Sequence, residues 1–172
     1  MSLPYRVVQF VRALTIHASP QQHQHVFEIL EPSLAELFFR MTPFDQAHSL
    51  RVLAALQLEG QTDPDLLAAA LLHDVGKSVH SPSVLDRIIA VLANQLFPRM
   101  VLKWGASGPH GWRRPFAITV QHPVWGAELA AAHGASTAVV DLIRLHQHPL
   151  PVEPRSAQDT LLKELRRVDS QY

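Results

Sequence analysis

The chain has no cysteine among its 172 residues. This absence excludes disulfide bonds and thiolate metal ligands, so any metal site must use histidine and carboxylate side chains. A chain without cysteine also suits a reducing compartment.

Long apolar runs and an excess of one charge are missing as well. The longest apolar stretches are a few residues long, far below the roughly 20 needed to cross a bilayer, and the N-terminus lacks the apolar core of a signal peptide. Lysine plus arginine and aspartate plus glutamate number 15 each, so no global field attracts nucleic acid or a membrane surface. We therefore expect a cytoplasmic protein with no membrane partner and no strong sign of a nucleic-acid partner.

Histidine, by contrast, is abundant, with 11 residues in a chain that is only 17% charged. The tract at 21–25 has no carboxylate beside it, and we interpret it as a polar helix start on the surface. The other histidines are candidates for ligands.

The length of 172 residues fits one domain with a full core, and apolar residues recur at helical spacing along it. We predict an all-α bundle of about seven to nine helices that forms a single domain over 1–172. Residues 1–41 are expected to form N-terminal packing helices, and residues 42–169 the functional core. The predicted helices lie at 4–15, 28–41, 42–58, 63–80, 84–96, 122–133, 137–147 and 156–169. The helix at 84–96 has an apolar face broad enough for burial.

The segment 63–80, DPDLLAAALLHDVGKSVH, carries the clearest signals. Asp63 is a good N-cap, Pro64 suits the first helical position, and Gly76 is expected to end the helix in a left-handed conformation. His73 and Asp74 fall beside the apolar stripe, so both should point inward. A buried carboxylate beside a buried imidazole needs a partner, which a divalent metal supplies economically.

This segment resembles the HD superfamily of metal-dependent phosphohydrolases, in which a distant histidine, an adjacent His-Asp pair and a distant aspartate bind metal. The local form HDxGK is matched by His73, Asp74, Gly76 and Lys77. The whole pattern is also similar to a set of uncharacterised bacterial HD proteins. The resemblance implies an HD-like helical bundle with Asp74 and Lys77 in catalytic roles, Lys77 reaching a phosphate oxygen.

The outer ligands come from the same resemblance. His48, in AHSLRVL on an apolar helix face, resembles the first histidine of the pattern, and Asp169 at the end of LLKELRRVD resembles the last aspartate. Asp159 and Asp141 compete with Asp169 for that place. The expected metal ligands are therefore His48, His73, Asp74 and Asp169.

Two later segments, HPVWGAEL and LIRLHQHP, resemble parts of the multinuclear HD-GYP branch that bind a second or third metal. They make His122, His146 and His148 candidates for a second metal or for substrate contacts. The chain departs from that branch because Gln147 replaces the second histidine of the pair and no GYP sequence follows.

A basic loop at 105–115 is a further candidate for substrate binding. No acidic residue occurs from 87 to 127, whereas five basic residues do. Arg113 and Arg114 are therefore candidates to hold a substrate phosphate, with Trp104 and Trp112 able to stack on a base. An ordinary solvated loop is the alternative.

With two imidazoles and two carboxylates, a six-coordinate ion keeps open positions for water and substrate. We expect one or two divalent ions, among Mn, Fe, Ni, Co or Mg, and hydrolysis of a nucleotide or other small phosphoester. The alternatives are a non-catalytic HD module that binds metal or nucleotide for regulation, and a di-iron HD oxygenase. A homodimer is possible from the apolar surface of the helices, although no heptad pattern specifies one.

Overall fold

The computed structural model describes residues 19–149 and 156–172. These residues form nine α-helices, two short 3-10 helices and no strand, which confirms the predicted all-α fold. The helix expected at 4–15 lies outside the described residues. In chain order the elements are α2 (Pro20–Ile29), α3 (Pro32–Arg40), α4 (Pro43–Leu58), α5 (Pro64–Leu72), η1 (Val75–Val79), α6 (Val84–Leu96), α7 (Pro98–Gly105), η2 (Gly111–Arg113), α8 (Arg114–Ala132), α9 (Thr137–Leu145) and α10 (Ala157–Asp169).

Local capping sets several helix starts where the sequence predicts them. Side-chain oxygens of Thr42, Asp63 and Ser156 each accept a hydrogen bond from the backbone N–H three residues later. These bonds satisfy amides that have no partner inside the helix. Gly60, with φ of +83°, follows the end of α4 in a conformation that glycine adopts without strain.

Helix α5 lies in the core and packs against α4, α9 and α10. Its Leu66, Leu71 and Leu72 are fully buried. Burying leucine side chains in this way contributes roughly 1.5–3 kcal/mol each to the hydrophobic driving force. Because α5 runs through the core, the residues that follow it, His73 and Asp74, are also buried, as predicted.

Gly76 has a different role from the one predicted. It lies in η1 and has no positive φ, so it is not a left-handed helix end. A Cβ atom at this position would lie 1.9 Å from the backbone oxygen of His122 and 2.6 Å from the backbone nitrogen of Gly126. Glycine is required here because η1 and α8 approach each other backbone to backbone.

Helix α8 also begins earlier than predicted. The sequence places a helix start at His122–Pro123, but α8 begins at Arg114, inside the predicted loop, and carries Pro123 in its interior. Proline is costly in a helix interior because it removes one backbone hydrogen bond. The continuous α8 packs against η1, α7 and α9. Because the helix is continuous, His122 lies in its buried middle.

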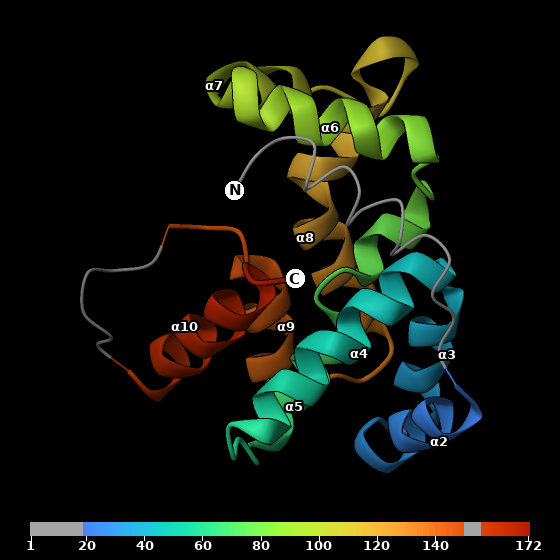
Figure 1. Ribbon diagram of the computed structural model, residues 1–172, viewed down its shortest axis with the longest axis vertical. Coiled ribbons are helices and arrows are strands. Elements are labelled where there is room, and N and C mark those ends of the chain that lie inside the picture. The colour runs from blue at the N-terminus through green and yellow to red at the C-terminus, as the bar shows by residue number, and fades with distance from the viewer. Residues whose placement is uncertain (1–18, 150–155) are drawn as a thin grey trace.

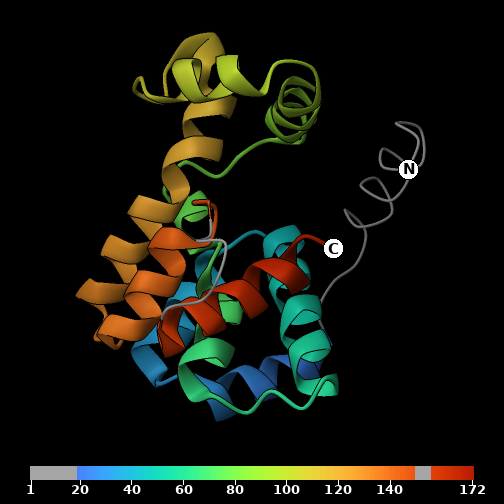
Figure 2. The same ribbon diagram turned by 90° about the vertical axis from the view of Figure 1, so that its left-hand side faces the viewer.

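Helices α6 and α7 form an arm at one end of the molecule, with α8 running from the arm into the rest of the bundle (Figures 1 and 2). The sequence predicts a buried apolar face for 84–96, yet α6 has no buried residue. Its Leu85 is 64% exposed and Leu96 is 67% exposed. An amphipathic pattern marks an apolar face, but it does not ensure that another element of the chain covers it.

Ion pairs attach the arm to the remaining bundle. Arg87 of α6 forms a two-pronged pair with buried Asp45 of α4, at 2.8 and 2.6 Å, and also donates to Thr42. Asp86 of α6 pairs with Arg114 at the start of α8. None of the described helices has the length and apolar character that crossing a membrane requires.

Candidate metal centre

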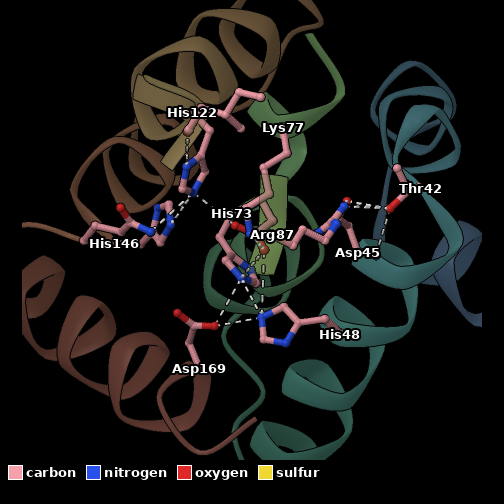
Figure 3. Close-up of polar contacts among 12 residues, drawn as sticks. Thr42, Asp45, His48, His73, Lys77, Arg87, His122, His146 and Asp169 are labelled. Carbon is pink, nitrogen blue, oxygen red and sulfur yellow. Dashed lines mark hydrogen bonds and ion pairs between the residues drawn. The ribbon is translucent and has the colours of Figure 1, made fainter. Parts of the chain in front are cut away.

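One group of possible ligands joins residues from three helices. His48 comes from the middle of α4, His73 directly follows α5, and Asp169 is the last residue of α10. His48 Nε2 lies 2.8 Å from Asp169 Oδ1 and 3.2 Å from His73 Nε2 (Figure 3). His73 Nε2 is 3.4 Å from the same carboxylate oxygen. We call these three residues the first triad.

A second group lies beside the first. It consists of Asp74, His122 of α8 and His146, which caps the C-terminal end of α9. His122 Nε2 lies 3.1 Å from Asp74 Oδ1 and 3.3 Å from His146 Nε2. In each group one ligand atom per residue lies within 4.8 Å of the others, a spacing that could hold a metal ion. We call this group the second triad.

Asp74 connects the two triads through its two carboxylate oxygens. Oδ1 faces His122, whereas Oδ2 lies 3.9 Å from His48 Nε2 and 3.7 Å from His73 Nε2. Adjacent histidine and aspartate residues at the end of α5 therefore serve both groups. A single carboxylate with one oxygen toward each triad has the geometry of a bridging ligand.

Three of the imidazoles are held in one orientation by backbone carbonyls. The Nδ1 atoms of His73, His122 and His146 lie 2.7–3.0 Å from carbonyl oxygens three or four residues earlier in their helices. A carbonyl oxygen can only accept, so each Nδ1 carries a proton and each Nε2 is the ring nitrogen that faces its triad. Such second hydrogen bonds fix the tautomer and orientation of metal-binding histidines.

The geometry of the Nε2 atoms calls for a cation. His122 Nε2 and His146 Nε2 approach to 3.3 Å, and the Nδ1 atoms of both rings are held by carbonyl oxygens. Two ring nitrogens at that distance need a positive charge between them, which a proton or a metal ion can supply. The residues present therefore fit a divalent metal in both the donor types and their arrangement.

The pKa values follow from burial and the two carboxylates. Burial alone would lower the pKa of His73, but the charges of Asp74 and Asp169 outweigh it and raise this pKa to about 9. Burial, with the charges of His122 and His73, lowers the pKa of His146 to about 3, so its lone pair is free at neutral pH. The first triad thus attracts positive charge strongly.

The carboxylates stay ionised despite their burial. Burial raises the pKa of Asp74, but the Lys77 ammonium and His73 outweigh this effect and hold the pKa well below its usual range. Burial likewise raises the pKa of Asp169, and the charge of His73 with a hydrogen bond from His48 lowers it by more. Both carboxylates are therefore available as anionic ligands.

Lys77 lies in a cleft beside the triads. Its Nζ is 2.5 Å from Asp74 Oδ2, and its side chain is 22% exposed. Burial lowers the pKa of Lys77, but the charges of Asp74 and Asp45 raise it by more, so the ammonium stays charged. The cleft has a volume of about 280 Å³; we call it the lysine cleft, and its lining includes Phe44, His48, Asp74, Lys77, Arg87, Ala90, Val91, Asn94, Ile118, Thr119, His122 and Gln147.

A second cleft adjoins the first, because Asn94, Thr119 and Gln147 line both. It has a volume of about 430 Å³. We call it the arginine cleft, and its lining includes Val101, Leu102, Arg144, His146, His148, Arg166, Asp169 and Ser170. The two clefts together pass along both triads. His48, Asp74 and His122 line the lysine cleft, and His146 and Asp169 line the arginine cleft.

The structure brings together His48, His73, Asp74, Asp169, His122 and His146, all six named as candidates from the sequence. Neither Asp141 nor Asp159, the two competitors of Asp169, belongs to either triad. His148 is exposed and lines the arginine cleft without joining a triad. Gln147, which interrupts the expected histidine pair, has its amide nitrogen 3.4 Å from His122 Nε2.

Arg113 and Arg114 of the basic loop line neither cleft, although Pro115 at the end of the loop lines the lysine cleft. Arg114 is engaged by Asp86 and by the backbone oxygens of His80 and Ser81. Arg113 donates to Ser107 and lies over the Trp112 ring.

The arginines that line the clefts are not Arg113 and Arg114, and they were not predicted from the sequence as substrate contacts. Arg87, Arg144 and Arg166 line the clefts. Helical spacing could have indicated one of them, because Arg166 precedes Asp169 by three residues and so shares its face of α10.

Comparison with known proteins agrees with this arrangement. No curated protein and no solved structure matches the chain. Residues 46–170 match the family model of the HD domain, a range that starts just before His48 and ends just after Asp169. Because this match covers well over half of the sequence, the chain belongs to the HD-domain family, a superfamily of metal-dependent phosphohydrolases.

Proposed function

We propose that the protein is a phosphohydrolase that binds one divalent cation at each triad and hydrolyses a nucleotide or other small phosphoester. The observation that supports this most directly is the position of Asp74, with one carboxylate oxygen toward each triad. The mixed nitrogen and oxygen donors suit Mn, Fe, Co, Ni or Mg. Counting Asp74 at both places, the first triad would supply four protein ligands and the second three, which leaves positions open for water and substrate on a six-coordinate ion.

When bound, such cations acidify water and neutralise the charge that develops on phosphate oxygens during in-line displacement. The protein itself supplies orientation and further charge. The carbonyl oxygens that hold the Nδ1 protons of His73, His122 and His146 keep the three rings turned toward the centre. These rings therefore need no rearrangement when the ligands are occupied.

Lys77 is the proposed contact to a nonbridging phosphate oxygen. One of its three N–H groups is directed to Asp74 Oδ2, which leaves two for substrate on the side of the lysine cleft. As a point charge, an ammonium can hold a phosphate oxygen while the charge on that oxygen grows. Its pairing with Asp74 also keeps it charged in a largely buried place.

The walls of the lysine cleft suit the uncharged part of a small substrate. Phe44, Val91 and Ile118 line it together with the charged residues. With a volume of about 280 Å³, the cleft is close to the lower end of ordinary ligand pockets. An apolar wall next to a phosphate site is the arrangement that a nucleoside or another compact alcohol group requires.

The test is a panel of nucleotides and small phosphoesters with Mn, Fe(II), Co, Ni and Mg, measured on the wild type and Asp74→Ala. The wild type should hydrolyse at least one compound in a metal-dependent manner, and Asp74→Ala should lose both bound metal and turnover. Asp141→Ala is the matched control, because Asp141 is exposed on α9 and belongs to neither triad.

Three outcomes would overturn the proposal. Unchanged hydrolysis in Asp74→Ala would exclude the metal centre as the catalyst. Tight nucleotide binding without turnover in any metal would identify a regulatory HD module instead. Two irons per chain with oxygen consumption and no phosphate release would identify a di-iron oxygenase.

A further inference from the structure

The arginine cleft is lined by two arginines on adjoining helices. Arg144 belongs to α9 and Arg166 to α10, and both are half-buried. Arg166 lies one helical turn before Asp169, and Arg144 lies two residues before His146. Both arginines therefore line the same cleft as one member of each triad.

These two arginines have no acidic partner among the described residues. Arg144 forms no ion pair or side-chain hydrogen bond there, and Arg166 donates only to the backbone oxygen of His148. Three arginines that connect elements are paired with carboxylates: Arg87 with Asp45, Arg114 with Asp86 and Arg167 with Glu59. The paired arginines show that the chain supplies carboxylates where a guanidinium serves to connect helices.

The only acidic residue in the described lining of the arginine cleft is Asp169. Its Oδ1 is occupied by His48 and His73 and lies among the ligands of the first triad. A cation bound at that triad would neutralise the negative charge of Asp169. Little negative charge would then remain to offset the positive charges of Arg144 and Arg166. The cleft then presents net positive charge beside the metal centre.

We propose that Arg144 and Arg166 bind a second phosphate group of the substrate, separate from the one that is hydrolysed. This inference rests on the proposed function, since it takes the triads as the place of the scissile phosphate. A guanidinium presents a planar fork of N–H donors that matches phosphate oxygens. The substrate class is thus a phosphoester with a second phosphate, its uncharged part in the lysine cleft and its second phosphate in the arginine cleft.

The continuity of the two clefts supports this division. Asn94, Thr119 and Gln147 line both clefts, so one ligand can extend from the walls around Lys77 past the triads to Arg144. A phosphate bound at the arginines adds binding energy away from the reacting atoms. Such remote binding energy fixes the orientation of the substrate at the metal centre.

The kinetic test compares two substrates that differ only in the second phosphate, adenosine 5′-monophosphate and adenosine 3′,5′-bisphosphate. The wild type should have the higher kcat/KM for the bisphosphate. Arg144→Gln/Arg166→Gln should lower that value by about tenfold or more, the usual loss for a charged hydrogen bond, and leave the monophosphate value unchanged. Arg99→Gln is the charge-matched control, because Arg99 is exposed on α7 and lines neither cleft.

An equal loss on both substrates, or no loss on either, would overturn the inference. A binding measurement keeps it testable even if neither nucleotide is hydrolysed, an outcome that would count against the proposed function alone. Calorimetry on the metal-loaded full chain should show tripolyphosphate binding about tenfold or more weaker in the double variant, with binding of inorganic phosphate unchanged. Equal tripolyphosphate affinity in the wild type and the double variant would contradict a second phosphate site.

Discussion

The part of the molecule that carries the triads and the α6–α7 arm differ in how they are held. Helix α5 buries Leu66, Leu71 and Leu72 completely, whereas α6 buries no residue and α7 buries only Val101 and Gly105. The triads thus lie on elements fixed by close packing. The arm packs on α8 mainly through α7, and two ion pairs, Arg87 with Asp45 and Arg114 with Asp86, connect its α6 to α4 and α8.

The two parts therefore have different tasks: the packed helices hold the metal ligands, and the arm forms part of the cleft wall. Metal ligands must be held within a fraction of an ångström, which packed helices achieve better than surface elements. The arm supplies Ala90, Val91 and Asn94 to the walls of the lysine cleft but no member of either triad. Changes in the arm should therefore alter which substrate fits, whereas changes in the packed part should alter stability and metal binding.

The largest expected effect comes from Gly76→Ala, at the backbone contact between η1 and α8. The added Cβ would meet the His122 oxygen at 1.9 Å, and backbone cannot move aside as a side chain can. We expect a loss of about 5 kcal/mol or more, enough to unfold a protein of ordinary stability. Circular dichroism and urea unfolding measure it.

Gly108→Ala is the control for that experiment. Gly108 is exposed near the arm, and an added Cβ would approach only the flexible side chain of His110, at 3.2 Å. Its free energy of unfolding should stay within about 0.5 kcal/mol of the wild type. A Gly76→Ala variant as stable as Gly108→Ala would contradict the close approach of η1 and α8.

A matched pair of leucines sharpens the comparison directly. Leu71→Ala removes a fully buried side chain of α5 and should cost about 2–5 kcal/mol of the free energy of unfolding. Leu85→Ala changes a residue of α6 that is 64% exposed and should cost no more than about 0.5 kcal/mol. Equal losses in urea unfolding would show that the face of α6 is covered in solution.

Substrate fit should respond to the arm without a change in metal content. Ala90→Phe would fill the lysine cleft from the side of α6. We expect KM for a nucleotide to rise several-fold, with metal per chain and the free energy of unfolding unchanged. If metal were lost together with affinity, the arm and the triads would not be separate units.

The smallest expected effect concerns pH and the pair that holds α6 to α8. Burial raises the pKa of Asp86, while hydrogen bonds from Ser83 and the guanidinium of Arg114 lower it by more, so the net pKa is depressed. A depressed carboxyl pKa contributes stability above its unfolded value of about 3.9, and that stability is lost as pH falls through the folded value. Asp86→Asn should therefore be slightly less stable than the wild type at pH 7.

The difference between the wild type and Asp86→Asn should shrink as pH falls below about 4. Thermal unfolding of both proteins across this range measures it. A difference that stays constant or grows toward acid would contradict the assigned contact with Arg114.

The sequence predicted best what depends on neighbouring residues. Asp63 and Thr42 cap helices through residues three positions away, so short-range patterns suffice to place these starts. The contact between Arg87 and Asp45 joins residues 42 positions apart, and no local sequence pattern predicts it. The inward direction of His73 and Asp74 was predictable because the apolar stripe of α5 fixes which side faces the core.

The wrong predictions concern residues whose sequence pattern is compatible with more than one structural role. Gly76 looks like a helix end but is needed for close backbone approach, and Pro123 looks like a helix start but lies within α8. The apolar face of α6 looks like core because helical periodicity says nothing about which surface covers it. The grouping of Asp169 with His48, in turn, depends on tertiary packing of helices 121 residues apart in sequence.

The most direct test of the proposed centre is the number and position of metal ions per chain, measured by anomalous diffraction from crystals of the metal-loaded protein. We predict two ions per chain, one at His48, His73 and Asp169 and one at His122 and His146, with Asp74 between them. His146→Ala should keep the first ion and lose the second. A single ion in the wild type, or loss of both ions in a folded His146→Ala variant, would contradict two separate cation sites joined by Asp74.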